Sequence, residues 1–272
     1  MHMRKEIQLT NGVKLAYVEE GTGEAVVLLH GFCGSSRYWD KLIPLLSRTH
    51  RVLAVDLRGH GHSAAPDEPY SMERFAEDIA LWAEAAGLAK FHLFGHSLGG
   101  YVTLAFAEKH ADKLASFGLI HSTPFPDDEA AKANRNKGAD SIRENGMEPF
   151  IKALVPKLFA PDHVASLTQE VQTAKDIGFA TSPVGAIQTL YAMRDRPDRN
   201  HVLQETALPV LLVAGAKDQI IPVEKTFTVE RSHVVHRLLP DAGHMGMLEA
   251  PEQLSEAIAD FVGKNSKSAP SA

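Results

Sequence analysis

One serine, Ser97, stands between glycines in the stretch LFGHSLGG, residues 93–100. An apolar run precedes it and a helical pattern follows it, so Ser97 falls at a turn between a strand and a helix. A turn this sharp strains the backbone, and Gly95 and Gly99 are needed where a Cβ would clash. The pattern predicts a serine hydroxyl presented as a nucleophile for acyl transfer.

A serine hydroxyl is a poor nucleophile until a base takes its proton, and that base needs an orienting carboxylate. Two later segments supply these groups: GAKDQIIP places Asp218 after an apolar run, and DAGHMGMLEAPE places His244 in a loop before the last helix. The chain order Ser, Asp, His is the one expected with such a turn. We therefore predict Ser97 as nucleophile, His244 as general base and Asp218 as the acid that orients it.

The tetrahedral intermediate of acyl transfer needs two N–H donors for its oxyanion. The N–H of Leu98 is one candidate, because it begins the helix after Ser97 and has no acceptor within that helix. The second donor is expected in the loop after an earlier strand. HGFCGSS directly follows the apolar run AVVLL, and we assign this role to the N–H of Phe32.

Two other chemistries are weighed against this prediction. Cys33 lies next to Phe32, but no neighbouring residue resembles a base for it, so a catalytic cysteine is disfavoured. His60 and His62 are spaced for metal binding, yet no third ligand stands at a useful spacing, and a structural loop is the better interpretation. We expect no metal and no organic cofactor.

The bulk composition is that of an ordinary soluble globular protein. The chain has 272 residues, of which 44% are hydrophobic. Its net charge of -6 does not favour binding to nucleic acid or to anionic lipid. Its single cysteine excludes a disulfide within the chain and is compatible with a reducing compartment. No signal peptide or membrane span is recognisable, so we expect a cytoplasmic protein whose partner is a small neutral molecule.

Short apolar runs alternate with helical patterns along most of the chain. Residues 6–10 and 13–20 flank Asn11-Gly12 and predict an opening antiparallel hairpin. The later runs are AVVLL, RVLAVDL, KFHLFG, LASFGLI, PVLLVAG and HVVHRLL, and the predicted helices cover 38–47, 72–87 behind an N-cap at Ser71, 98–110, 223–230 and the residues after Pro251. This alternation predicts an α/β fold with a mostly parallel eight-stranded sheet and helices on both faces.

The alternation breaks between residues 122 and 201, where helical periodicity continues without clear strands. We predict a core formed by residues 1–122 and 202–264, a helical insertion over 123–201, and a flexible tail over 265–272. An insertion after a strand end would roof the site. Its apolar residues are candidates for an acyl pocket, although side chains at helical spacing are more often simply packed; we name Phe125, Phe159, Leu190 and Met193, with Phe150, Leu154 and Leu158 beside them.

Together these segments resemble the α/β-hydrolase superfamily. The matching motifs run in the family's usual order: HGFCGSS, DLRGHGHS, GHSLGG, GAKDQIIP and GHMGMLEAPE. The resemblance implies the α/β-hydrolase fold, a helical cap in the place of the insertion, and the roles already assigned to Ser97, Asp218, His244, Phe32 and Leu98. A serine at position 97 argues against haloalkane dehalogenases and epoxide hydrolases, which carry aspartate there.

The activity that the resemblance most often implies is hydrolysis of carboxylic esters through an acyl-enzyme, with water as second substrate and a short or medium acyl chain. Menaquinone-pathway-type lyases, enol-lactonases, carbon–carbon bond hydrolases and cofactor-free perhydrolases share these motifs, and so do slow-turnover hormone receptors. A lyase would want cationic residues in the cap, for which Arg194 and Arg196 are candidates. An exposed helix end is the interpretation that we favour for both arginines. The oligomeric state is not readable from the sequence.

Overall fold

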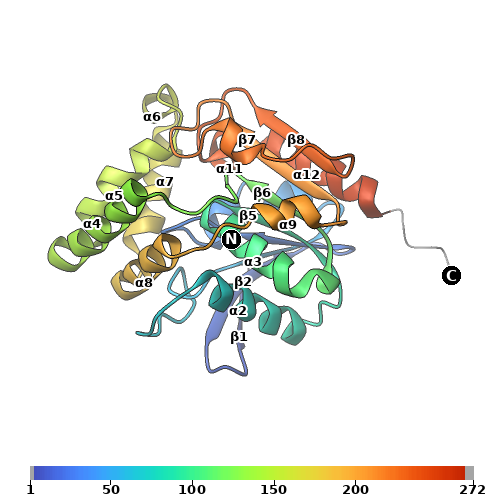
Figure 1. The fold of residues 1–272 in the computed structure, drawn as a ribbon, viewed down its shortest axis with the longest axis horizontal. Coiled ribbons are helices and arrows are strands. Elements are labelled where there is room, and N and C mark those ends of the chain that lie inside the picture. The colour runs from blue at the N-terminus through green and yellow to red at the C-terminus, as the bar shows by residue number, and fades with distance from the viewer. Residues whose placement is uncertain (1–2, 267–272) are drawn as a thin grey trace.

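The computed structural model describes residues 3–266, and within them the chain forms one eight-stranded sheet (Figure 1). The strands are β1 (Arg4–Gln8), β2 (Lys14–Glu20), β3 (Ala25–Leu29), β4 (Arg51–Val55), β5 (Phe91–His96), β6 (Leu114–Ile120), β7 (Val210–Gly215) and β8 (Val234–Leu239). They lie in the order β1-β2-β4-β3-β5-β6-β7-β8; β2 is antiparallel to β1 and β4, and all other pairs are parallel. The predicted strands and the mostly parallel sheet are confirmed.

The opening hairpin forms as predicted, but its turn is wider than a two-residue turn. Leu9 N–H donates to Val13 O at 2.8 Å and Gly12 N–H donates to Leu9 O at 3.1 Å. Gly12 has a φ of 87°, whereas Asn11 is not among the described residues with positive φ. The Asn11 side chain instead accepts from Val13 N–H and donates to Asp78, which fixes the turn against the core.

Helices cover both faces of the sheet, and the alternation of side chains along β5 shows it. Phe91 contacts Phe106 of α3 (Leu98–His110), with ring centroids 5.6 Å apart. Phe94, three residues further along the strand, points to the opposite face of the sheet. Its ring centroid lies 6.1 Å from that of Phe261 in α12 (Pro251–Asn265). Helix α2 (Met72–Ala85) packs on α3, while α1 (Ile43–Leu46) and α11 (Gly246–Glu249) pack with α12.

Two predicted helices are shorter in the structure. The segment 38–47 is divided into a short 3-10 helix, Ser36–Trp39, and α1, which carries Pro44 in its first turn, where the missing N–H of proline is tolerated. The segment 223–230 is helical only over α10 (Val223–Thr226). Beyond it, Phe227 stacks flat on His236 of β8 at 4.4 Å, a tertiary contact that ends the helix. The Ser71 cap is confirmed, because its side chain accepts from Arg74 N–H.

The segment between β6 and β7 contains helices and no strand within the described residues. The helices are α4 (Glu129–Asn145), α5 (Met147–Leu154), α6 (His163–Ser166), α7 (Thr168–Phe179), α8 (Pro183–Arg194) and α9 (Asn200–Glu205), with a 3-10 helix at Val155–Leu158. Helices α4 to α8 gather to one side of the sheet, at the left of Figure 1. Helix α9 packs on α3, away from that group.

Asn265 and Ser266, the first two residues of the predicted tail, lie at the end of α12. Asn265 still belongs to α12, and its side-chain amide donates to Phe261 O at 2.7 Å. Ser266 donates to Val262 O at 2.8 Å, so the last helical turn is closed by side-chain bonds. The rest of that tail, 267–272, lies outside the described residues. Within the described part of the chain, no helix combines the length and apolarity that crossing a membrane requires.

Four of the histidines buried at the carboxyl edge of the sheet have strongly lowered pKa values. Burial lowers the pKa of His30 to about 4, and it lowers the pKa of His60 and of His121 to about 3. The pKa of His96 also lies well below its ordinary value, first through burial and then through the neighbouring His244. These imidazoles are therefore neutral in the folded protein at neutral pH.

The first testable prediction concerns the contact between α3 and β3. A Cβ on Gly99 would lie 2.4 Å from the backbone oxygen of Leu29, which cannot move away. We expect Gly99→Ala to lower the free energy of unfolding by about 1–3 kcal/mol, measured by urea denaturation. Gly263→Ala is the control, because its Cβ would meet nothing within 4 Å on an exposed face of α12. It should gain about 0.5–1 kcal/mol; equal effects of the two variants would contradict the packing described.

The second prediction concerns acid stability. Between pH about 4 and the ordinary His pKa of 6.5, the unfolded chain binds more protons than the folded one, so stability falls as the pH is lowered through this window. Each of these buried histidines should cost about 2 kcal/mol at pH 5 relative to pH 7. We expect His60→Gln to reduce the loss by about that amount in urea titrations at the two pH values. The exposed His62→Gln should leave the loss unchanged, and an equal slope in all three proteins would rule out this origin.

Candidate active site

Ser97 lies at the turn between β5 and α3 in a conformation that L-residues rarely adopt, with φ 51° and ψ −111°. Four hydrogen bonds hold it there, one of them from Tyr101 N–H to the carbonyl oxygen of Ser97 at 3.3 Å. Its N–H donates to Ile120 O at 3.0 Å, and its carbonyl accepts from Gly100 N–H at 2.9 Å and from Ser122 Oγ at 2.8 Å. A Cβ on Gly95 would lie 2.0 Å from Gly99 O, so the turn closes only with glycine there. The predicted sharp turn is present.

The loop after β3 lies directly beside this serine. A Cβ on Gly31 would come within 3.4 Å of Ser97 Cβ, which shows how closely the two segments approach. The N–H groups of Phe32 and Leu98 donate to no protein acceptor among residues 3–266. The structure thus brings both predicted oxyanion donors to the Ser97 turn with their N–H groups free.

Asp56, a residue with no predicted role, holds the loop that carries Phe32. Its carboxylate is almost fully buried and accepts from Ser36 N–H at 2.6 Å and from His62 N–H at 2.9 Å. It therefore ties the loop after β3 to the loop after β4. The motif DLRGHGHS indicated this loop in the sequence, but nothing in it indicated the hydrogen bond between Asp56 and Ser36.

His244 and Asp218 meet as predicted, although 26 residues separate them. The Nδ1 of His244 is 2.8 Å from Oδ2 of Asp218, whose other oxygen accepts from the N–H groups of Ile220 and Ile221 at 2.8 and 3.0 Å. Both side chains are nearly inaccessible to solvent, at 2% and 1%. Because Nδ1–H donates to the carboxylate, Nε2 is the ring nitrogen left to act as a base.

The charge state of Asp218 suits this arrangement. Burial alone would raise the pKa of its carboxyl, but the charge and hydrogen bond of His244 outweigh burial, and the pKa lies below its ordinary value. Asp218 is therefore a carboxylate at neutral pH. The His244 ring lies 5.0 Å from the ring of His96, the residue before Ser97, so the imidazole reaches the Ser97 turn. Ser97 Oγ itself makes no hydrogen bond within residues 3–266.

The two rival chemistries find no support in the described residues. Cys33 is buried, and burial raises the pKa of its thiol well above the ordinary value, so it is a neutral thiol and a poor nucleophile. His60 is also buried; its ring packs on His30 at 5.1 Å and its Nδ1 bonds Arg58 O. His62 is exposed, so these two side chains differ in environment.

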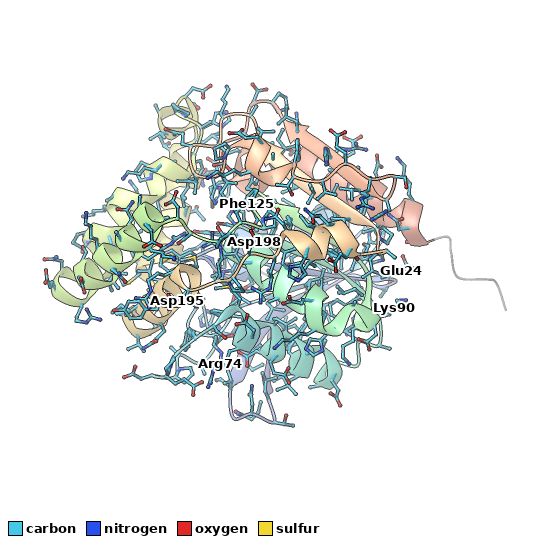
Figure 2. All side chains as sticks on the ribbon, viewed as in Figure 1. Glu24, Arg74, Lys90, Phe125, Asp195 and Asp198 are labelled. Carbon is cyan, nitrogen blue, oxygen red and sulfur yellow. The ribbon has the colours of Figure 1, made fainter. Side chains whose placement is uncertain are left out.

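A hollow of about 520 Å³ opens between α3, the segment after β6 and the segment after β7, and neither Ser97 nor His244 is among the residues that line it. Its lining includes Tyr101, one helical turn after Ser97, and Thr123, which follows β6. Phe125 and Ile220, 38% and 42% exposed, bring apolar surface to it. In Figure 2 the labelled Phe125 and Asp198, which both line the hollow, lie near the middle of the view, between the α4–α8 helices and α9.

The other predicted pocket residues are packed side chains. Phe159 is fully buried, and Leu190 and Met193 are each 2% exposed; none of them lines this hollow. Leu190 lies between α8 and α4, where a Cβ on Gly138 would come within 3.4 Å of its Cδ1. Of the four residues named for the acyl pocket, the structure therefore brings only Phe125 to the hollow.

Neither Arg194 nor Arg196 is fully exposed at the helix end, as we expected both to be. Arg194 is half-buried and pairs with Asp195. Arg196 is buried at 8% exposure, and our interpretation of it was wrong. Its guanidinium lies 4.0 Å from the ring centre of Tyr101 and binds Asp127 Oδ1 at 2.6 Å. Asp127 also binds Arg135 at 2.9 Å, so Arg135 and Arg196 share one carboxylate. Arg196 thus contacts α3 from the end of α8 and also lines the hollow.

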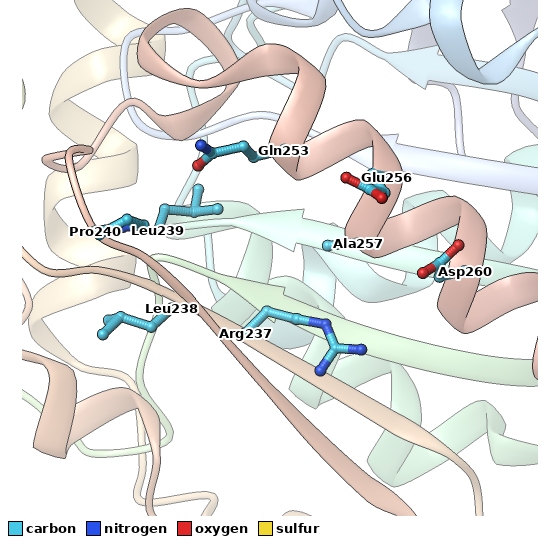
Figure 3. A pocket seen from close by; sticks show the side chains of 8 residues that line it. All are labelled: Arg237, Leu238, Leu239, Pro240, Gln253, Glu256, Ala257 and Asp260. Atoms are coloured by element: carbon cyan, nitrogen blue, oxygen red, sulfur yellow. The ribbon is translucent and has the colours of Figure 1, made fainter.

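A second hollow of about 300 Å³ lies away from these residues, between β8 and α12 (Figure 3). It is lined by Arg237, Leu238, Leu239, Pro240, Gln253, Glu256, Ala257 and Asp260. None of the predicted site residues borders it, so it is not the place where Ser97 could meet a substrate.

Known proteins resemble this chain over most of its length. An esterase from Thermogutta terrifontis, solved with malate bound, has a TM-score of 0.92 and 31% identity, covering 97% of this chain and 99% of that one. The 2-hydroxy-6-oxo-6-(2'-aminophenyl)hexa-2,4-dienoic acid hydrolase of Metapseudomonas resinovorans is 27% identical over 93% of this chain and 89% of its own.

A further relative is longer than this chain. The dihydrolipoyllysine-residue acetyltransferase component of the acetoin cleaving system of Pseudomonas putida is 31% identical over 89% of this chain, which spans only 64% of that relative's length. The family model described as the alpha/beta hydrolase fold matches residues 24–251. With the sheet order and the Ser97 turn in agreement, this chain belongs to the α/β-hydrolase family.

Proposed function

We propose that this hydrolase cleaves carboxylic esters of small to medium acyl chain, with Ser97 as nucleophile, His244 as general base and Asp218 as the acid that orients His244. The observation that carries the proposal is the 2.8 Å bond from His244 Nδ1 to a buried carboxylate, which leaves Nε2 as the basic nitrogen beside the Ser97 turn. The similarity to the Thermogutta terrifontis esterase supports the reaction class.

In the first half of the reaction, Ser97 Oγ attacks the ester carbonyl carbon while its proton passes to Nε2 of His244. The oxyanion that forms accepts from the N–H groups of Phe32 and Leu98, which would each stabilise the transition state by about 3 kcal/mol. The ester C–O bond then breaks, and the leaving alkoxide takes the proton from His244. The alcohol departs and the acyl group stays on Ser97.

In the second half, water attacks the acyl carbonyl and gives its proton to His244. The bond between Ser97 Oγ and the carbonyl carbon then breaks, and Oγ takes the proton back from His244. Asp218 stays ionised throughout, because it stabilises the imidazolium that forms in each half-reaction. Ser97 Oγ has no hydrogen bond among residues 3–266; we propose that its bond to His244 forms when a substrate binds.

The preference for a small to medium acyl chain rests on the hollow lined by Tyr101, Phe125 and Ile220, which we propose as the place of the acyl group. About 520 Å³ with apolar surface from Phe125 and Ile220 suits a compact neutral ester rather than a long acyl chain. We propose Phe125 as a residue that contacts the substrate.

A second candidate is hydrolysis of a carbon–carbon bond, which the Metapseudomonas resinovorans relative supports by its name. It would use the same three side chains. Against it, Arg196, the buried cation of the hollow, already binds Asp127, a carboxylate that it shares with Arg135. Ester hydrolysis is therefore the function we favour. Enol-lactone hydrolysis, the menaquinone-pathway-type lyase reaction and slow receptor-like turnover would use the same triad.

The decisive test replaces Ser97. We expect wild type to turn over p-nitrophenyl butyrate many times and to gain the mass of one fluorophosphonate adduct. Ser97→Ala should lose the adduct and at least about 10³-fold in kcat/KM, because the nucleophile is gone. Ser166→Ala, at an exposed serine on α6, is the control and should behave as wild type. Labelling of Ser97→Ala at the wild-type rate would disprove the assignment; a single stalled turnover would favour a receptor.

Chain-length preference is tested with p-nitrophenyl esters from acetate to palmitate. We expect kcat/KM to be highest for the short and medium chains and to fall by more than about tenfold for palmitate, because we propose that the hollow takes a compact acyl group. Phe125→Ala should lower kcat/KM for butyrate by about 10-fold or less, through loss of apolar contact. A maximum at long, water-insoluble chains would contradict the proposed substrate class.

A further inference from the structure

Glu249, the last residue of α11, holds the loop that carries His244 from both sides. Its side chain is fully inaccessible to solvent. The carboxylate accepts from Gly243 N–H at 3.0 Å to each oxygen and from Met245 N–H at 2.9 Å. Gly243 and Met245 are the two neighbours of His244 in the chain. One carboxylate therefore fixes the peptide groups on either side of the proposed base.

The same carboxylate reaches into the helical insertion. Oε2 of Glu249 accepts from Ala160 N–H and from His163 Nδ1, both at 2.8 Å, although these residues lie 89 and 86 positions away in the chain. A Cβ on Gly243 would lie 2.4 Å from Ala160 N, so the two segments touch backbone to backbone. Glu249 thus joins the His244 loop to the start of α6.

Further bonds join the same segment of the insertion, residues 158–163, to both loops of the site. His244 N–H donates to Leu158 O at 2.8 Å. Gln219, the residue after Asp218 in the chain, donates from Nε2 to Phe159 O at 3.2 Å. The carboxylate of Glu249 is the only one of these groups that bonds the insertion and both neighbours of His244 at once, among the described residues.

Burying a carboxylate is costly unless its oxygens are satisfied by hydrogen bonds. For Glu249 these donors come from two segments that must both be in place, so the carboxylate is stable only when the insertion and the His244 loop keep this relative position. Moving segment 158–163 away would leave the carboxylate with two of its four donor groups. The contact therefore resists any opening of the insertion on this side.

We infer that Glu249 is a positioning residue that, with His163, anchors the helical insertion to the His244 loop and so holds the base in line with Ser97. This inference rests on the proposed function, because it acts through His244. It makes the insertion part of the apparatus that places the base, in addition to its place beside the substrate hollow.

Glu249→Gln tests the anchor with almost no change of shape. An amide keeps one acceptor oxygen and puts a donor in place of the other, so either Met245 N–H or the two donors of the insertion lose their acceptor. We expect kcat on p-nitrophenyl butyrate to fall about 10–100-fold, because the base is displaced by a fraction of an ångström, with KM within about two-fold of wild type. Glu148→Gln, at an exposed ion pair with Lys152 on α5, is the matched control and should behave as wild type.

His163→Ala removes the insertion's side-chain donor and spares the core, because that side chain is 18% exposed. We expect a smaller loss of kcat, about 3–10-fold, and faster amide hydrogen exchange at Gly243 and Met245. The double variant should lose no more than Glu249→Gln alone, because both changes break the same connection. A side chain with a merely local structural role would leave exchange in the His244 loop unchanged.

The outcomes separate this inference from the proposed function. If wild type is active and labelled at Ser97, while folded His163→Ala keeps kcat within two-fold and wild-type exchange in the loop, the anchor is disproved and the function stands. Losses that multiply in the double variant would also overturn it. If Glu249→Gln fails to fold, His163→Ala decides. If wild type is neither active nor labelled, the proposed function itself has failed.

Discussion

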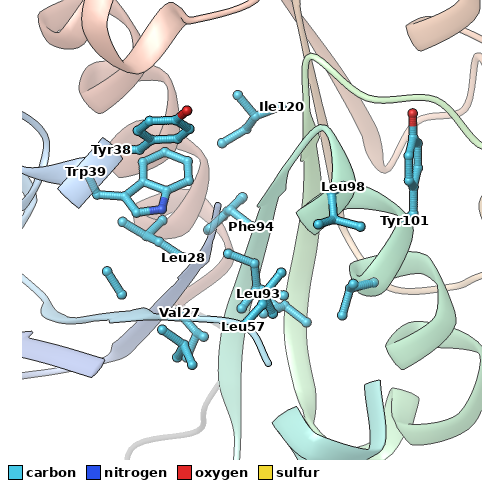
Figure 4. Packing of buried hydrophobic residues seen from close by; sticks show 14 of the residues in the cluster. Val27, Leu28, Tyr38, Trp39, Leu57, Leu93, Phe94, Leu98, Tyr101 and Ile120 are labelled. Atoms are coloured by element: carbon cyan, nitrogen blue, oxygen red, sulfur yellow. The ribbon is translucent and has the colours of Figure 1, made fainter. Parts of the chain in front are cut away.

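The site depends on one steric constraint, the close approach of backbone to backbone around Ser97. Helix α3 begins so near the ends of β3 and β5 that Gly95 and Gly99 have no room for a Cβ, and Ser97 takes a φ of 51° between them. Such a strained conformation persists only where the contacts around it are strong enough to hold it. Figure 4 shows that support: Leu98 and Tyr101 lie on one side of β5, and the aromatic pair Tyr38 and Trp39 lies on the other.

The order of strands explains why residues distant in the chain meet at this turn. Strand β5 lies between β3 and β6, and β7 and β8 follow on the same side, so the loops after these parallel strands open at one edge of the sheet. Phe32 follows β3, Ser97 follows β5, Asp218 follows β7 and His244 follows β8. The hydroxyl, the carboxylate, the imidazole and the free N–H groups are therefore brought together by topology rather than by sequence proximity.

The helical insertion is joined to this edge at several buried polar contacts. Arg196 binds Asp127 and lies over Tyr101 of α3, and the buried Arg199 binds Glu73 of α2 and Glu108 of α3. Such pairs are retained only when both partners are held, because an unpaired buried charge is strongly unfavourable. The ring of Phe32 also contacts Phe150 of α5 at 6.0 Å, so the insertion touches the loop of the proposed oxyanion donor as well.

The sequence by itself determined the strands and the mostly parallel sheet, and it singled out Ser97, Asp218 and His244 as candidates, because apolar periodicity, glycine at a sharp turn and chain order are local properties. It could not determine which apolar side chains of the insertion face a substrate: Leu190 and Met193 have the same helical spacing whether packed or exposed. Nor could it show that Arg196 is buried, that Phe227 ends a helix by stacking on His236, or that Glu249 bonds Ala160. Those facts depend on contacts between segments far apart in the chain, and only the tertiary structure decides which partner each side chain meets.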